Sequence, residues 1–209
     1  MKTLGLISLT FLISINLFAQ KIDEDKEKVW YGVDFSNTYL IGEQGFRNPE
    51  ILNQEFKKLN FKIVNEVGKY NLGRTFNQKV LLFDFTPIFN NMNKIDFAKN
   101  IKAKNTDSKI TFDDLQKIIN GYSYPDKNKI GIIYIVEELN KFTETATVIV
   151  VAFDTDTKKI TSAKRYRGLA SGIGIASHWA NAIARINQKI RFNNNIVKNS
   201  TPKIKTINL

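Results

Sequence analysis

The chain has 209 residues, of which 43% are hydrophobic and 24% charged, the ordinary range for a globular protein. This composition excludes disordered, collagen-like and membrane-embedded proteins. There is no cysteine and only one histidine, His178, so disulfides, thiolate catalysis, a zinc ribbon and a multi-histidine metal site are excluded too. The formal net charge of +11 suits an anionic partner without identifying one.

Residues 1–19 have the order of a secretory signal peptide. Lys2 gives a positive start, an apolar stretch runs from Leu4 to Phe18, and Ala19 is a small residue at the expected cleavage position. The stretch is shorter than the roughly 20 apolar residues that a membrane span needs, so a cleaved leader is favoured over a signal anchor. We therefore expect a periplasmic or secreted protein with no transmembrane segment after cleavage.

A flexible charged arm is expected next, at residues 20–28, followed by a single α/β domain at 29–192. The first strand is predicted from Val29 to Phe35. A helix should then begin at Asn48-Pro49, with Asn48 as its cap. Its buried face is predicted from apolar positions that recur every three to four residues: Leu52, Phe56, Leu59, Ile63 and Val67.

A second strand is predicted from Lys79 to Phe85, because its apolar density is typical of a strand covered on both faces. The polar segment 90–107 should contain only a short helix around residues 96–102. A firmer helix is expected to begin at Thr111, which can cap its free amides, and to end near Gly121.

Three strands are predicted at 130–138, 146–154 and 160–167, and the short polar segments between them indicate an antiparallel meander. A glycine-rich turn leads to the last helix, whose apolar stripe should pack on the sheet: Ile175, Trp179, Ala182, Ile183, Ile186 and Ile190. Residues 193–209 read as a polar, basic tail. The order β-α-β-α-β-β-β-α predicts an α+β fold, a mixed five-stranded sheet with helices packed on it.

Three strands end in aspartate: Asp34, Asp84 and Asp154. If these ends converged, the carboxylates would form a cluster able to hold a divalent cation or share a proton, as in an envelope hydrolase. The alternative is that each carboxylate caps the turn that follows its strand. We favour the alternative and expect no bound metal and no cofactor.

The loop from Gly168 to Gly174 lies between a strand and a helix, where exposed amides can bind phosphate. It lacks the Gly-Lys-Ser/Thr ending and the third glycine of nucleotide-binding fingerprints, so we interpret its glycines as allowing a tight turn and close packing. We expect His178 to be structural or partly exposed, because the sequence offers it no clear nucleophile as a partner. We expect Trp179 to lie in the core.

Charge distribution is the sharpest feature of the sequence. From Thr157 to Leu209 there are eleven basic residues and no acidic one. Such polarity would create a positive face for phosphates, lipopolysaccharide, anionic lipid or a polyanionic glycan. The alternative is an AT-rich genome, which enriches Lys, Asn and Ile without any binding role. The candidate anion-binding residues are Lys164, Arg165, Arg167, Arg185, Lys189 and Arg191.

Several segments resemble a family of uncharacterised secreted or periplasmic proteins from Bacteroidetes-type bacteria: Tyr31–Ser36, Ile132–Lys141, Val151–Asp154 and Gly168–Ile183 with its central Trp179. The resemblance spans nearly the whole mature chain and implies export and a compact α/β fold. It implies no activity and no catalytic residues. Family members carry an aromatic residue where His178 stands here, so the resemblance does not mark this histidine as essential.

We therefore expect an exported, non-enzymatic accessory or binding protein of the cell envelope that presents its basic C-terminal part to an anionic component. An envelope hydrolase using Asp34, Asp84 and Asp154 is the alternative. Nucleic acid is not expected as a partner, because an exported protein rarely meets it and no aromatic-basic RNA signature is present.

Overall fold

The computed structural model describes residues 26–79, 81–104 and 109–197. The predicted leader at 1–19 and most of the predicted arm at 20–28 lie outside these residues. The end of the arm is not free, because Lys28 already belongs to the first strand and the Glu27 carboxylate pairs with Lys129 Nζ at 2.8 Å.

The described chain contains strands and helices of very different lengths. In order they are β1 (Lys28–Asp34), β2 (Tyr39–Ile41), α1 (Leu52–Asn65), α2 (Val67–Tyr70), α3 (Leu72–Thr75), β3 (Leu82–Phe83), α4 (Thr86–Met92), β4 (Ile101–Lys102), α5 (Phe112–Gly121), β5 (Ile130–Asn140), β6 (Thr145–Asp154), β7 (Ile160–Leu169) and α6 (Ile175–Val197). Three 3-10 turns lie at Glu43–Phe46, Pro49–Ile51 and Phe97–Asn100. The α+β class predicted from the sequence is confirmed.

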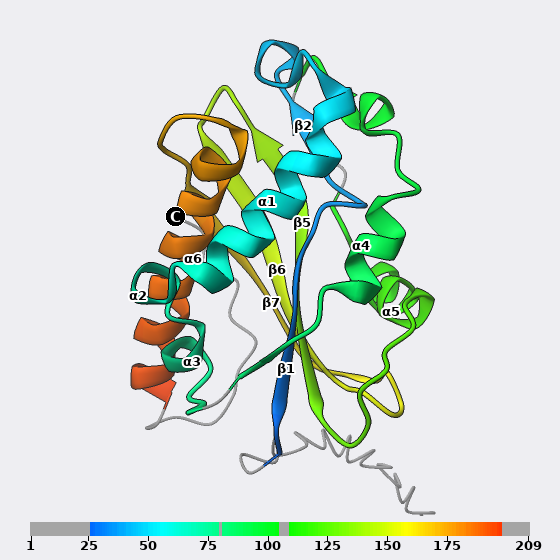
Figure 1. The fold of residues 1–209 in the computed structure, drawn as a ribbon, viewed down its shortest axis with the longest axis vertical. Helices are drawn as coiled ribbons and strands as arrows, with labels where there is room; N and C mark the ends of the chain where they lie inside the picture. The colour runs from blue at the N-terminus through cyan, green and yellow to red at the C-terminus, as the bar shows by residue number, and fades with distance from the viewer. Residues whose placement is uncertain (1–25, 80, 105–108, 198–209) are drawn as a thin grey trace, which may run out of the picture.

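A single mixed sheet of seven strands runs through the described residues (Figure 1). Strand β5 is central: its first half pairs in parallel with β1 and its second half with β2, while β6 and β7 continue on the other side as the predicted antiparallel meander. The sheet has two strands more than the sequence predicted, because β2 and β4 are too short to leave an apolar pattern. These two pair with each other in parallel.

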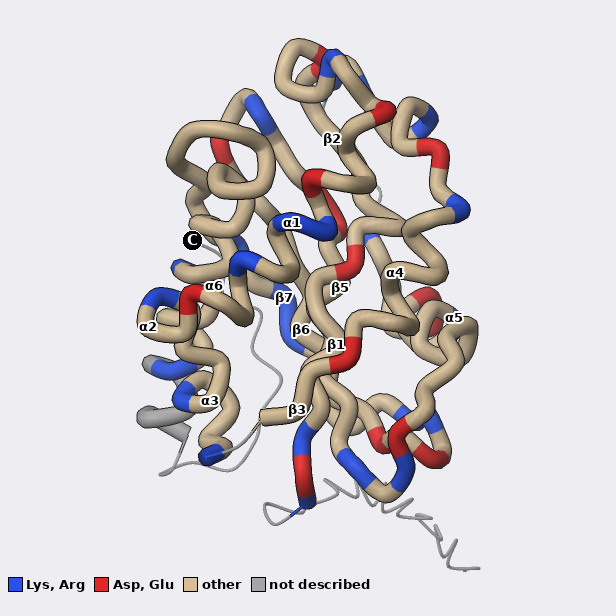
Figure 2. The backbone as a smooth tube through the Cα atoms, viewed as in Figure 1, with Lys and Arg blue, Asp and Glu red and all other residues tan. Residues whose placement is uncertain are grey.

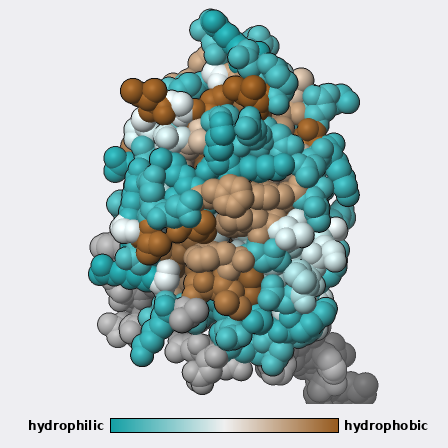
Figure 3. All heavy atoms as spheres, in the orientation of Figure 1, coloured by the Kyte–Doolittle hydropathy of each residue, from teal (hydrophilic) through white to brown (hydrophobic). Residues whose placement is uncertain are grey.

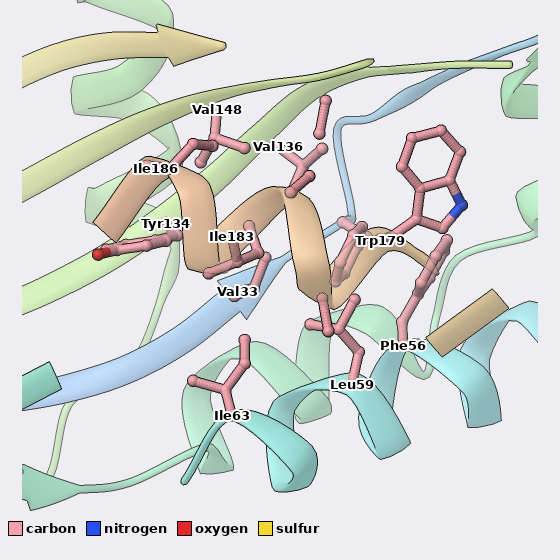
Figure 4. Close-up of a cluster of buried hydrophobic side chains, with 14 of the residues drawn as sticks. Val33, Phe56, Leu59, Ile63, Tyr134, Val136, Val148, Trp179, Ile183 and Ile186 are labelled. Atoms are coloured by element: carbon pink, nitrogen blue, oxygen red, sulfur yellow. The ribbon is translucent and has the colours of Figure 1, made fainter. Parts of the chain in front are cut away.

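Helices cover both faces of the sheet (Figure 1). One core lies under α1 and α6, where Phe56, Leu59 and Ile63 meet Trp179, Ile183 and Ile186 over the strands (Figure 4). The second core lies under α4 and α5 and is rich in tyrosine and isoleucine. The predicted apolar stripe of the last helix is confirmed, since its residues from Trp179 to Ile190 are buried against the sheet.

The capping prediction for the helix at Thr111 is also confirmed. The Thr111 hydroxyl accepts from Asp114 N at 3.2 Å, and the Asp114 carboxylate accepts from Thr111 N at 3.0 Å, a reciprocal capping box. At the earlier helix the prediction was wrong in detail. Asn48 makes no side-chain cap, the α-helix begins at Leu52, and Val67 is exposed in α2 instead of buried in the stripe.

Two further predictions need correction. The segment from Lys79 to Phe85 is not a strand covered on both faces: only Leu82 and Phe83 pair with β1, and these side chains are 36% and 47% exposed. The rings of Phe61, Phe85 and Phe89 contact one another, and Phe61 is 49% exposed. Figure 3 shows apolar atoms gathered near the middle of this face of the molecule. The predicted tail at 193–209 begins too early, since α6 continues to Val197.

Beyond the short strand β3, the outer side of β1 is closed by a side chain. Asn60 of α1 is fully buried, and its amide accepts from Val33 N at 2.7 Å and donates to Val33 O at 3.0 Å. This pair of bonds replaces those of a neighbouring strand. Gly32, at φ 104°, makes room for it, because a Cβ there would lie 2.6 Å from Asn60 Oδ1.

Candidate functional site

The six predicted anion-binding residues lie on two adjoining elements, β7 and α6, but they do not share one face. Side chains alternate along a strand, so Lys164 points to the α6 side together with Gly168, whereas Arg165 and Arg167 point to the opposite side. Arg185, Lys189 and Arg191 belong to α6. The prediction of a single positive face containing all six is therefore wrong.

Arg165 is engaged by other residues of the protein, although its side chain remains 40% exposed. Its guanidinium binds the buried Glu137 carboxylate through two bonds of 2.9 Å, and its Nη2 also donates to Ile110 O. Glu137 accepts a further bond from Ile110 N at 2.7 Å. This bidentate pair joins β5, β7 and the segment before α5. Arg165 therefore has a structural role, and Glu137 neutralises its charge.

Three of the remaining candidates, Arg185, Lys189 and Arg191, belong to α6. Arg185 and Lys189 are exposed and one helical turn apart, and Lys189 Nζ donates to the carbonyl of Arg167 at 2.9 Å. Arg191 Nη1 donates to Thr75 Oγ1 at 3.1 Å. These acceptors carry no charge, so the positive charges are not neutralised by them.

We call Lys164, Arg185, Lys189 and Arg191 the basic stripe. Within the part of the chain that the structure describes, none of the four forms an ion pair, although ten other ion pairs are present. Figure 2 shows basic residues gathering on the side of the molecule where α2, α3 and α6 lie. Lys189 reaches β7 and Arg191 reaches the α2–α3 segment, so these two do not share one side of α6. The exposed, adjacent pair Arg185 and Lys189 is therefore the part of the stripe best suited to an anion-binding face.

The three strand-end aspartates do not converge. Asp34 lies opposite Ile135 of β5 while Asp154 lies opposite Ile130, five positions away, which is about 17 Å along the strands. Asp84 follows β3 beside Trp30. Among the described residues no group of three acidic or histidine side chains could hold a metal ion. The carboxylate cluster, the hypothesis that the sequence analysis did not favour, is therefore not formed by these three residues.

Two of these aspartates cap turns, as the alternative interpretation held. Asp84 Oδ1 accepts from Thr86 N at 2.9 Å, and Asp154 Oδ1 accepts from Asp156 N and from Thr157 N and Oγ1. The bonds from Thr157 outweigh partial burial and hold the pKa of Asp154 below its ordinary value. Both carboxylates are explained by local structure.

Asp34 is different, because it is completely buried at the interruption between β1 and β2. Its carboxylate accepts from Ser36 N at 3.0 Å, from Ser36 Oγ at 2.7 Å and from Tyr122 Oη at 2.5 Å. Burial raises the pKa of Asp34, and the bonds from Tyr122 and Ser36 only partly oppose that rise. These contacts hold the segment after α5 against the interruption between β1 and β2.

The glycine-rich loop does not leave the start of α6 open for phosphate. The Glu55 carboxylate from α1 accepts from Ala176 N at 3.3 Å and occupies the helix N-terminus. A Cβ on Gly168 would lie 2.3 Å from the carbonyl oxygen of Ala182, so this glycine permits the close approach of strand and helix. The interpretation of the glycines as turn and packing residues is confirmed.

His178 lies in a cluster that the sequence did not predict. Its Nε2 is 2.5 Å from Glu144 Oε2 and its Nδ1 is 3.2 Å from Gly172 O, so both ring nitrogens face oxygen acceptors. Lys141 Nζ also binds Glu144, at 2.9 Å. Partial burial raises the pKa of Glu144, but Lys141 and His178 outweigh it and lower that pKa overall. The histidine joins α6 to the β5–β6 turn, in agreement with a structural role.

Two open hollows flank the turn Glu43–Phe46. One, of about 470 Å³, is lined by Arg47 and Pro49 among others, and the other, of about 480 Å³, by Lys141 and Phe142. Neither is lined by Asp34, by His178 or by the basic stripe. These two hollows are therefore not part of the candidate functional surface, which is the exposed side of α6.

A comparison with protein-family models and with curated proteins finds no match for this chain. The resemblance to secreted bacterial proteins stays a prediction.

Proposed function

We propose that the protein is a non-enzymatic accessory or binding protein of the bacterial envelope, and that it binds an anionic envelope component through the basic stripe. The observation that carries the proposal is the outer side of α6, where Arg185 and Lys189 are exposed, adjacent and without an acidic partner among the described residues. Lipopolysaccharide, anionic lipid and polyanionic glycans all offer the matching chemistry, a dense array of phosphate or carboxylate groups.

The envelope setting comes from the leader-like residues 1–19, and periplasmic or secreted location is part of the proposal. Among the described helices, none combines the length and apolar character needed to span a bilayer. Binding through cations should weaken steeply with salt, because each contact is an exposed ionic interaction.

The test compares two double variants that remove the same charge from opposite sides of the sheet. Arg185→Gln/Lys189→Gln changes the basic stripe, whereas Lys117→Gln/Lys127→Gln removes two exposed lysines from the α5 side. Each cation near an anionic surface contributes about 1 kcal/mol, so the stripe variant should bind roughly 30-fold more weakly at low salt. Arg191 is left unchanged because it supports the α2–α3 segment.

Binding is measured with lipopolysaccharide, phosphatidylglycerol vesicles and heparin over a salt series. The proposal predicts that at least one probe binds the wild type, that salt weakens binding, and that the stripe variant loses affinity while the control does not. Equal losses in both variants would indicate attraction by net charge alone. Failure of all three probes to bind the wild type at low salt would refute the proposal.

A further inference from the structure

The loop before α6 exposes an apolar side chain almost completely. Ile173 is 97% exposed, and the glycines on either side of it have φ values of 107° and 81°. Two more exposed apolar residues lie at the same end of the sheet, Phe142 in the β5–β6 turn at 68% and Leu169 at the end of β7 at 59%. Figure 3 shows an apolar group protruding from a hydrophilic surface over this loop.

The loop is held in place by the first turns of α6. Asn181 Nδ2 donates to Ser171 O at 2.6 Å, His178 N donates to Gly174 O at 2.9 Å, and His178 Nδ1 lies 3.2 Å from Gly172 O. These bonds fix the backbone on both sides of Ile173. The side chain of Ile173 therefore points outward from a loop whose backbone is fixed by hydrogen bonds, and nothing in the described chain covers it.

Ile173 lies at the N-terminal end of α6, the helix that exposes Arg185 and Lys189 further along. Positions 174, 178, 181, 185 and 189 recur every three to four residues, so they follow one line along the helix. Ile173 precedes this line, Arg185 lies on it, and Lys189 ends it about 21 Å from the helix start. This end-to-end surface thus combines an exposed apolar residue with two cations. The helix itself contains no acidic residue, and the one carboxylate that contacts this line, Glu144, is paired with Lys141 and His178.

We propose that this side of α6 docks flat on an anionic lipid bilayer, with Ile173 inserted below the headgroups and the cations among them. The inference rests on the proposed function and narrows its ligand to lipid. A soluble polyanion would use Arg185 and Lys189 but would leave Ile173 exposed to water. A bilayer offers phosphates and an apolar interior together, as it does to amphipathic interfacial helices, so it complements both parts of the surface.

The test uses tryptophan as a depth probe, because Trp30 and Trp179 are both buried and should not respond to lipid. Ile173→Trp is mixed with phosphatidylglycerol vesicles that carry brominated acyl chains. Phe112→Trp is the control, since Phe112 is 57% exposed but lies at the start of α5 on the opposite face. We expect a blue shift and quenching at position 173 and neither at position 112.

A second variant, Ile173→Ser, separates insertion from charge attraction. We expect its affinity for the vesicles to fall about tenfold and its affinity for heparin to stay unchanged. Vesicle binding without quenching, or with undiminished affinity in Ile173→Ser, would overturn the inference and leave the proposed function standing. So would heparin binding without vesicle binding. A dimer that Ile173→Ser dissociates would assign the surface to a second copy of the chain. Failure of every anionic probe would refute both proposals.

Discussion

Asn60 substitutes for a strand at the outer side of β1, and its replacement by alanine should lower the free energy of unfolding by about 3 to 4 kcal/mol. The side chain is completely buried and makes three bonds of 2.7 to 3.0 Å, two to the backbone of Val33 and one to Phe56 O. Alanine leaves the Val33 N–H and C=O unpaired and buried, and each unpaired group costs about 1 to 3 kcal/mol.

Urea unfolding at 25 °C measures this loss directly. Asn53→Ala is the matched control, because Asn53 lies on the same helix and makes only long bonds of 3.3 and 3.4 Å. It should cost less than about 1 kcal/mol. Asn60→Asp keeps the acceptor for Val33 N but loses both donor bonds and buries a charge, so it should be destabilising as well. If Asn60→Ala lay within about 1 kcal/mol of the wild type, the argument that this amide closes the sheet would be refuted.

Three other predictions concern structure. Burial raises the pKa of Asp34 above the value of 3.8 that it has in the unfolded chain, so the folded state keeps its proton to higher pH. The stability that the protonated carboxyl contributes is therefore lost as the pH rises above 3.8. In urea titrations, the free energy of unfolding of the wild type relative to Asp34→Asn should fall with rising pH. Arg165→Ala should destabilise by about 1 to 3 kcal/mol by leaving Glu137 buried without its partner, whereas Arg167→Ala should change thermal unfolding little. Gly168→Ala should cost about 1 to 3 kcal/mol, because its Cβ would clash with the α6 backbone; a melting temperature equal to that of the wild type would contradict the contact.

Local sequence patterns predicted much of the fold. The Thr111 cap, the hairpins of β5 to β7 and the stripe of α6 depend on residues close together in the sequence, and all three were predicted. The prediction for the segment around Leu82 and Phe83 was wrong. An apolar run has the same composition whether it is a strand covered on both faces or an exposed edge strand of two residues.

The candidate site was predicted in part. The excess of basic residues located α6 and β7, and the period of two in a strand could already have separated Lys164 from Arg165 and Arg167. A glutamate inside the apolar run of β5 was a signal for a buried ion pair, but its partner two strands away depends on a register that the sequence does not reveal. The exposure of Ile173 likewise depends on how its loop is held by α6.

The most direct test of the central claim is lysine footprinting with and without a saturating anionic ligand, using phosphatidylglycerol vesicles, lipopolysaccharide or heparin. Acetylation is measured at Lys189 on the basic stripe and at Lys117 on the opposite face, both exposed in the free protein. Our account predicts that ligand protects Lys189 and leaves Lys117 as reactive as before. Unchanged acetylation of Lys189 at saturation, or equal protection of both lysines, would contradict it.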